Sequence, residues 1–327
     1  MIINNKNLSK GEKHILKIKI TKLSNGNELY LTAHIITGIN EGKTIGLIGG
    51  IHGDETHCFE FFKNFIEKIN PKELSGNIII LPVANPLAFE YCVRNTPEDN
   101  LDLNRNFPGN RDGWLTEKIA YVISEELVKK MDYLIDFHTS PPFLHVEYSV
   151  ISKKAKEKDI AIKLAKSFGF KYIYNSFGYN GAVTTYANEI GITAIATESG
   201  PRDDKDSYYY NKMVDKIENA LSSIGFIKKE FEFANEYFIF EEDAYGNIRA
   251  PVGGIFIPSE QNTLIGKRVT ENDVLFRIYD PYTFDLINET KPCFKEADIF
   301  LYRKRSVVKP GDYSFMICDT KKLKKVT

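Results

Sequence analysis

The sequence predicts an α/β domain followed by a smaller all-β domain, and three observations carry this prediction. Apolar runs typical of strands alternate with segments of helical spacing over residues 1–228. Over residues 229–327 helical periodicity disappears, and short β-rich runs alternate with Gly, Pro and Asn turns. The length of 327 residues is ample for two buried cores. We therefore expect a largely parallel or mixed sheet in the first domain and a separate β domain after it.

The N-terminal elements follow from local patterns. Residues 14–20 alternate with period two, residues 28–36 are β-rich, and Asn25-Gly26-Asn27 between them predicts a hairpin turn. The apolar run 43–51 is typical of a buried central strand. A helix is expected directly after it, because apolar residues recur at helical spacing until Pro71 ends the pattern.

The same alternation continues along the chain. Strands are expected at residues 77–83, 133–137 and 193–197, and helices at 114–130, 159–168, 182–189 and 208–224. Ligands of such sheets bind at the carboxyl ends of the strands. His52, His138 and Glu198 each follow an apolar strand directly, so the sequence predicts that all three meet at one sheet edge.

Composition excludes several classes of partner. Lys and Arg number 43 against 44 Asp and Glu, and the formal net charge of −1 gives no global basic field for a nucleic acid or an anionic membrane. No apolar run approaches the ~18–20 residues of a membrane span, and the N-terminus lacks the apolar core of a signal peptide. We expect a cytoplasmic protein with no nucleic-acid or membrane partner. A homo-oligomer stays possible, because the sequence carries no signal for the oligomeric state.

The cysteines are expected to take no part in the chemistry. They are far apart and form no C-x-x-C pair, so a disulfide framework and a cysteine-based zinc site are both unexpected. We expect four reduced and buried thiols. They are Cys58, Cys92, Cys293 and Cys318.

The sharpest local signal is His52-x-x-Glu55, where the first buried strand gives way to the expected helix. An imidazole and a carboxylate three residues apart can point at one metal ion, and His138 after another buried strand supplies a third ligand. Two histidines and a glutamate form the catalytic zinc pattern, which leaves a coordination position for water. H-x-x-E alone is a weak motif, and its alternative interpretation is a chance match on a surface helix.

A polar segment between the ligands adds further candidates. Arg94 near a metal can stabilise a developing oxyanion, and Asn104 with Arg105 can hold a substrate carboxylate. The alternative is a surface loop rich in turn residues. Glu198, just after an apolar strand, is either a loop residue or a general base beside a zinc-bound water. Arg202 is a further candidate for carboxylate binding.

Together, these motifs in this order resemble the zinc carboxypeptidase superfamily, and most closely its succinylglutamate desuccinylase/aspartoacylase branch. The resemblance covers about residues 40–200. It rests on Gly49-Gly50-Ile51-His52-Gly53-Asp54-Glu55, on Asn85-Pro86-x-Ala88-Phe89 and on Asp102-Leu103-Asn104-Arg105-x-Phe107-Pro108-Gly109.

The C-terminal part is similar to the β domain attached to such deacylases, whose repeats resemble biotinyl/lipoyl-type modules. Residues 249–254 and 308–313 carry this similarity. The segment has no Met-Lys pair and no Asp-Lys hairpin tip, so we expect no carried cofactor.

The resemblance implies one Zn²⁺ per chain, held by His52, Glu55 and His138. It implies Glu198 as the residue that activates the zinc-bound water, which attacks the amide. Arg94 would then polarise the scissile carbonyl.

For the substrate, the resemblance implies that Asn104 and Arg105 bind a carboxylate. The expected activity is hydrolysis of the amide bond of a small N-acylated amino acid or related amine, a carbon–nitrogen bond other than a peptide bond. One alternative is a zinc carboxypeptidase acting on a short peptide, which would share the metal, base and oxyanion groups. The β domain favours the deacylase, since it could cap the site against long chains. A second alternative is a non-catalytic zinc or ligand-binding protein, but the base and every ligand are present.

Overall fold

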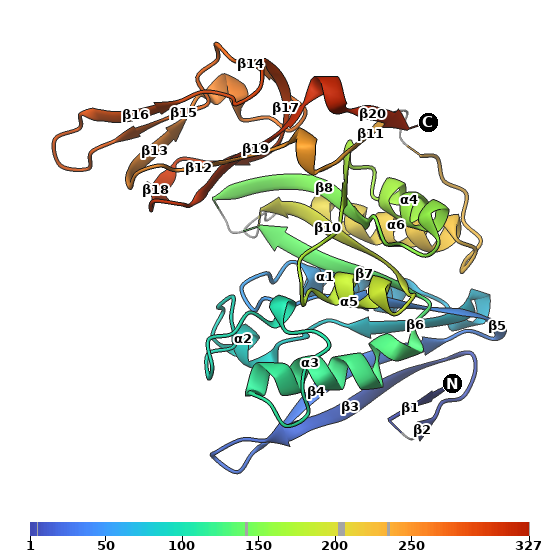
Figure 1. The fold of residues 1–327 in the computed structure, drawn as a ribbon. Coiled ribbons are helices and arrows are strands. Elements are labelled where there is room, and N and C mark those ends of the chain that lie inside the picture. Colours follow the sequence, from blue (N-terminus) through green and yellow to red (C-terminus); the bar gives the residue numbers. More distant parts are fainter. Residues whose placement is uncertain (5, 141–142, 202–206, 234–235, 327) are drawn as a thin grey trace.

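The computed structural model describes residues 1–4, 6–140, 143–201, 207–233 and 236–326. The N-terminal two thirds form a mixed α/β layer structure (Figure 1), as the sequence predicts. Its strands are β1 (Ile2–Ile3), β2 (Lys6–Asn7), β3 (Glu12–Lys22), β4 (Glu28–Thr37), β5 (Asn40–Ile48), β6 (Ser75–Leu81), β7 (Tyr133–Ser140), β8 (Leu144–Ser152), β9 (Tyr172–Ser176) and β10 (Thr193–Pro201).

Helices cover both faces of the central sheet. They are α1 (Cys58–Lys68), α2 (Pro86–Glu90), α3 (Leu115–Glu126), α4 (Lys158–Ser167), α5 (Val183–Glu189) and α6 (Ser207–Ser223). One apolar core unites α1, α4 and α6 with side chains such as Leu47 and Phe137. A second core unites α3 and α5 with side chains such as Ile48 and Leu134. Since side chains alternate along a strand, the even-numbered residues of β7 face the second core.

The order of the strands decides which strand ends lie side by side, and so where the predicted site lies. β5 pairs in parallel with β6 and β7, β7 pairs in parallel with β10, and β8 runs antiparallel to β10. The carboxyl ends of β5, β7 and β10 therefore lie at one edge of the sheet. At the other end of the order, β4 runs antiparallel to β6, and β3 closes the hairpin expected around Gly26.

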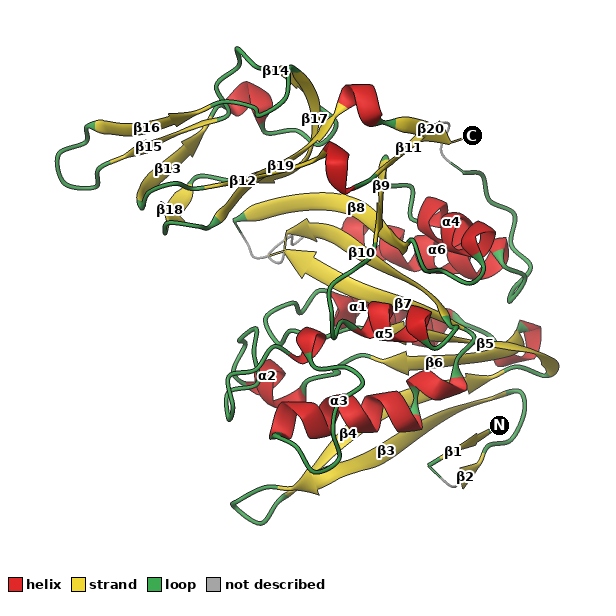
Figure 2. Ribbon diagram, in the orientation of Figure 1, coloured by secondary structure: helices red, strands yellow, loops and turns green. Residues whose placement is uncertain are grey.

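The C-terminal part consists of strands and short 3-10 turns in the residues that the structure describes (Figure 2). Its strands are β11 (Tyr237–Phe240), β12 (Tyr245–Arg249), β13 (Gly254–Pro258), β14 (Arg268–Thr270), β15 (Phe276–Tyr279), β16 (Leu286–Thr290), β17 (Glu296–Arg303), β18 (Ser306–Val308), β19 (Tyr313–Asp319) and β20 (Lys324–Val326).

This part has a core of its own and also continues the central sheet. Phe256, Phe276 and Phe315 lie in its separate apolar core. However, β17 pairs with β8, and β11 pairs with β9, so the 14-stranded sheet runs through both parts. The boundary between residues 228 and 229 and the similarity to biotinyl/lipoyl-type modules both stay predictions.

Several local expectations need correction. The helix after β5 begins only at Cys58, because residues 52–55 form a turn. β7 and β10 continue past the expected ends, so His138 and Glu198 lie within strands rather than after them.

Cys92 and Cys293 are exposed, whereas all four cysteines were expected to be buried. β8 and β9 carry too many polar side chains to be recognised from an apolar run. No helix of the described residues is long and apolar enough to cross a membrane.

Candidate functional site

A tight turn after β5 aims two of the predicted side chains in one direction. The Glu55 N–H donates to the His52 carbonyl oxygen at 3.2 Å, which closes the turn. Gly53 sits against α2, and a Cβ there would lie 1.9 Å from the carbonyl carbon of Ala88. Only glycine fits this close approach, so the glycine of the motif lets the turn press against its neighbour.

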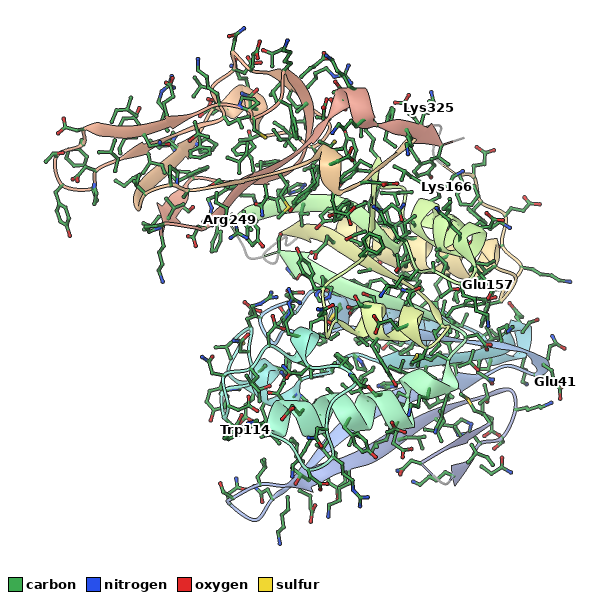
Figure 3. The ribbon with its side chains drawn as sticks, in the orientation of Figure 1. Glu41, Trp114, Glu157, Lys166, Arg249 and Lys325 are labelled. Atoms are coloured by element: carbon green, nitrogen blue, oxygen red, sulfur yellow. The ribbon has the colours of Figure 1, made fainter. Side chains whose placement is uncertain are left out.

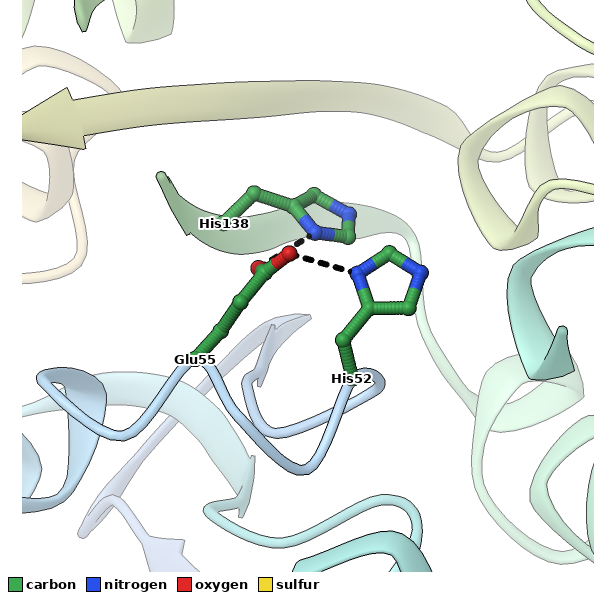
Figure 4. A group of neighbouring side chains, drawn as sticks. All are labelled: His52, Glu55 and His138. Carbon is green, nitrogen blue, oxygen red and sulfur yellow. Dashed lines mark hydrogen bonds and ion pairs between the residues drawn. The ribbon is translucent and has the colours of Figure 1, made fainter. Parts of the chain in front are cut away.

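The turn meets the end of β7 in a buried cluster of three predicted residues (Figure 4). His52 Nδ1 lies 2.7 Å from Glu55 Oε1, and His138 Nδ1 lies 2.9 Å from Glu55 Oε2. One ligand atom from each residue falls within 4.8 Å of the others, and all three residues are buried. The Thr139 N–H also donates to Glu55 Oε2 at 3.0 Å and fixes the carboxylate. The structure thus brings the predicted ligand set together.

Two further carboxylates hold the outer nitrogens of the histidine rings. His52 Nε2 lies 3.1 Å from Asp102 Oδ1, and His138 Nε2 lies 2.8 Å from Asp136 Oδ2. Both rings therefore present Nδ1 to Glu55. Histidines that bind a metal ion commonly have the other ring nitrogen bonded to a carboxylate, which fixes the tautomer and raises the basicity of the ring. The donor set and its supports therefore fit a divalent metal ion.

The charges within the cluster stabilise one another. Burial alone would raise the pKa of Glu55, but the two histidines outweigh burial and hold that pKa below its ordinary value. Burial alone would lower the pKa of His138, but Asp136 and Glu55 raise it well above the ordinary value. The pKa of His52 rises for the same reason, through Glu55 and Asp102. An environment that favours positive charge on both rings also favours a cation between them.

Glu198 lies next to this cluster on β10. It is in register with His138 of β7 on one side and with Tyr148 of β8 on the other. Burial raises the pKa of Glu198 to about 7, and the negative charge of Glu55 adds to this rise, whereas His138 opposes it. No hydrogen bond reaches its carboxylate from the residues that the structure describes. A carboxylate that titrates near neutral pH is suited to accept and return a proton.

Arg94 also reaches the cluster, from the loop after α2. Its Nη2 donates to Asp102 Oδ2 at 3.0 Å, and its Nη1 lies 3.6 Å from Glu55 Oε1. Asp102 therefore contacts both Arg94 and His52. The guanidinium remains about half exposed, so it can meet a substrate oxygen beside the metal-ligand cluster.

Asn104 and Arg105 lie close by, with different surroundings. Asn104 is buried, with Nδ2 3.0 Å from His138 Nε2, and its Oδ1 accepts from the Val183 N–H at 2.9 Å. Arg105 is exposed and lies over the ring of Tyr179 at 4.4 Å, while its Nη1 donates to the Asn104 carbonyl oxygen. Carboxylate binding by this pair stays a prediction. Arg202 lies outside the described residues.

The sequence reasoning missed four residues of the site. Asp102 stands inside a quoted motif without a role, and Asp136 lies unremarked in the strand expected at residues 133–137, although it precedes His138 by two residues and so shares its face of the strand. That spacing was a usable signal. Tyr148 was missed because β8 was not recognised, and Tyr179 lies in a loop with no pattern of its own.

The fold and the cluster together define an α/β protein with a candidate metal centre at the carboxyl ends of parallel strands. Residues 41–224 match the sequence profile described as the succinylglutamate desuccinylase/aspartoacylase catalytic domain. This match covers more than half of the chain, and the protein belongs to that family.

Curated and solved relatives agree with this assignment. The chain is 29% identical over 247 residues to the N-alpha-acetyl-L-2,4-diaminobutyric acid deacetylase of Halomonas elongata, covering 73% of this chain and 71% of that protein. The product-bound ectoine utilization protein EutE from Ruegeria pomeroyi superposes with a TM-score of 0.84 at 22% identity, over 96% of this chain and 98% of that one. A succinylglutamate desuccinylase/aspartoacylase from Rhodobacter sphaeroides superposes with a TM-score of 0.82 at 20% identity, over 95% and 96%. These two likenesses show the shared fold.

Proposed function

We propose that the protein is a zinc-dependent deacylase that hydrolyses the amide bond of a small N-acylated amino acid or related amine. The observation that carries this proposal is the register of β10 with β7, which sets Glu198 beside the His52–Glu55–His138 cluster. A partly buried base next to a metal-ligand set is the arrangement that metal-assisted hydrolysis of an acyl group requires.

The proposed cofactor is one Zn²⁺ held by His52, Glu55 and His138. Two imidazoles and one carboxylate are a catalytic zinc set, and they leave a position open. When bound, the ion supplies Lewis acidity, which polarises the carbonyl group and lowers the pKa of water to about 7. Asp102 and Asp136, bonded to the outer nitrogens, would hold the two rings with Nδ1 toward the ion.

The remaining steps belong to side chains of this chain. Glu198 takes a proton at its carboxylate from the attacking water and returns it to the leaving nitrogen, so the amide and water become a carboxylic acid and an amine. Arg94 donates to the carbonyl oxygen as negative charge develops there, and Asp102 holds its guanidinium in place. The partly buried position of Glu198 keeps its proton affinity matched to neutral pH.

The substrate class rests on the relatives and on Arg105. The relative from Halomonas elongata is named for deacetylation of an N-acetylated amino acid, which makes N-acetyl amino acids the first class to test. Arg105 has donors beyond the one bonded to the Asn104 carbonyl oxygen, so it remains able to bind a substrate carboxylate. Asn104 then contributes mainly by fixing the segment that carries Arg105.

The deciding experiment compares two substrate sets on zinc-loaded protein. We expect release of free amine from N-acetyl and N-succinyl amino acids, including N-alpha-acetyl-L-2,4-diaminobutyrate, and no hydrolysis of N-blocked dipeptides. Release of C-terminal residues from the blocked dipeptides would instead identify a carboxypeptidase. Zinc binding with no turnover of either set would identify a binding protein.

A further inference from the structure

Two arginines hold their guanidinium groups over tyrosine rings. The Arg105 guanidinium is 4.4 Å from the ring centre of Tyr179, and the Arg249 guanidinium is 3.9 Å from the ring centre of Tyr313. Arg249 and Tyr313 face each other across paired strands β12 and β19 of the C-terminal part. One of these two arginines therefore comes from outside the segment that carries the metal ligands.

These two arginines have no acidic partner within the described part of the chain. In the same C-terminal part, Arg268 pairs with Asp298 at 2.9 Å, and Arg277 pairs with Glu289 at 2.9 Å. Among the residues that the structure describes, no carboxylate lies within ion-pair distance of Arg249 or Arg105. Each keeps a full positive charge that protein groups do not neutralise.

Arg249 and Glu198 both act electrostatically on Tyr179, as do Tyr313 and Arg105. Figure 3 labels Arg249 at the end of β12, on the side of the molecule where β7 and β10 end. We call Arg105, Tyr179, Arg249 and Tyr313 the outer cluster.

Tyr148 joins the outer cluster to the buried part of the site. It lies opposite Glu198 in register and interacts electrostatically with Glu198, Tyr179 and Tyr313. The residue is partly buried, and within the described part of the chain its hydroxyl has no hydrogen-bond partner. Tyr148 therefore interacts both with the base and with two tyrosines of the outer cluster.

We propose that Arg249, supplied by the C-terminal part, binds a carboxylate of the substrate at the end remote from the scissile amide. This inference rests on the proposed function, and it assigns substrate selection to both parts of the chain. The exposed Arg249 guanidinium lies over the ring of Tyr313, and Nη1 donation to the Gly311 carbonyl oxygen at 2.8 Å fixes its direction. The planar edge with its other N–H groups forms no hydrogen bond within the described residues. A preset planar edge of this kind matches a carboxylate with two parallel hydrogen bonds.

The test compares Arg249→Gln with Arg277→Gln, which removes an equal charge from an arginine already paired with Glu289. Both variants and the wild type are assayed with N-acetyl-L-glutamate, whose side-chain carboxylate is remote from the scissile amide, and with the carboxamide N-acetyl-L-glutamine, which lacks that carboxylate. We expect Arg249→Gln to raise KM about 10- to 100-fold for the acid with kcat within about twofold, because binding remote from the reacting bond is uniform. KM for the carboxamide should not change, and Arg277→Gln should match the wild type. Arg249→Lys should recover only part of the affinity, since ammonium lacks the planar edge.

Equal changes for the acid and the carboxamide, or an unchanged KM in Arg249→Gln, would overturn the proposal. Calorimetry separates this result from failure of the proposed function. If the wild type hydrolyses no N-acyl amino acid, the deacylase proposal fails, and binding of N-acetyl amino acids to metal-free protein then decides the role of Arg249. Binding that is lost in Arg249→Gln and kept in Arg277→Gln supports it, whereas binding that is absent from the wild type or unchanged in the variant refutes it.

Discussion

The metal-ligand cluster and the outer cluster hold their side chains in opposite ways. In the first, Glu55 contacts two histidines and a backbone N–H, and each histidine is held at its other nitrogen by an aspartate. In the second, two arginines lie on aromatic rings, each with one guanidinium N–H bonded to a backbone carbonyl oxygen.

The difference separates the chemistry from the choice of substrate. Buried groups that are bonded on every side keep one geometry, which a metal ion requires. Stacked and exposed cations keep their orientation and still have donors to offer. Changes in the metal-ligand cluster should therefore affect metal binding and kcat, whereas changes in the outer cluster should affect KM.

The largest effect is expected from His138→Ala. Loss of one ligand leaves two, so zinc content should fall below stoichiometric levels and hydrolysis should disappear. Metal analysis and a hydrolysis assay measure both effects, with His14→Ala on β3 as the control. Full zinc content in His138→Ala would show that the metal binds elsewhere.

Glu198→Gln should separate catalysis from metal binding. The amide keeps the shape of the side chain but cannot accept the proton, so kcat should fall about 10²- to 10⁴-fold while zinc stays bound. The control is Glu189→Gln at the end of α5, an exposed glutamate paired with Lys154. An unchanged kcat would show that Glu198 does not accept the proton of the attacking water.

Asp136→Asn tests whether Asp136 orients His138 as a metal ligand. Removing the negative charge that faces His138 Nε2 should weaken zinc affinity about 10- to 100-fold, measured by competition with a chelator. Asp132→Asn makes the same change at the other end of β7, where the carboxylate pairs with Lys43, and should leave zinc affinity unchanged. Equal affinities in all three proteins would mean that Asp136 does not orient His138.

The pKa of Glu198 predicts a pH effect on metal-free protein. It is about 7 in the folded state and near 4.5 in the unfolded chain, so between these values the folded protein keeps a proton that the unfolded chain has lost. This contribution to the free energy of unfolding is present at low pH and is lost as the pH rises to 7. Urea unfolding at pH 5 and pH 8 should show a decrease of roughly 1–3 kcal/mol in the wild type relative to Glu198→Gln. Parallel pH profiles of the two proteins would contradict the raised pKa.

The smallest effect is expected where β9 of the N-terminal part contacts β17 of the C-terminal part. The Tyr172 hydroxyl on β9 donates at 2.9 Å to the buried carboxylate of Asp298 on β17. Tyr172→Phe should lower the free energy of unfolding by about 1–2 kcal/mol, since a buried acceptor loses a donor. Tyr282→Phe changes an exposed ring in the C-terminal part and serves as the control. A loss no greater than that of the control would mean that other donors satisfy Asp298.

Both histidines of the metal-ligand cluster and the neighbouring Glu198 could be predicted from the sequence because they stand where apolar runs end. His52, His138 and Glu198 are polar side chains at the ends of buried runs, and parallel strands bring such ends together. The mixed α/β class followed from the same alternation. The start of α1 at Cys58 was missed. The residues of the motif form a turn before the helix, and this turn depends on a contact with α2 that local sequence does not show.

The outer cluster was beyond prediction for a physical reason. Tyr179 and Arg249 belong to segments 70 residues apart, and neither stands at the end of an apolar run. Their proximity depends on how β17 pairs with β8 and β11 with β9, and local patterns do not encode such long-range pairing. Asp102 was in view as part of a motif, but its role depends on the orientation of the His52 ring.

The pairing of β17 and β9 with opposite halves of β8 also decides which fragments of this protein can be handled alone. A chain cut after residue 228 would lose β17 and β11, which are the strands that pair with β8 and β9. Apolar side chains of β8 such as Leu144 and Val146 would face solvent beside unpaired backbone groups. Such an edge recruits other chains, so the truncated product should collect in insoluble aggregates rather than behave as a minimal enzyme.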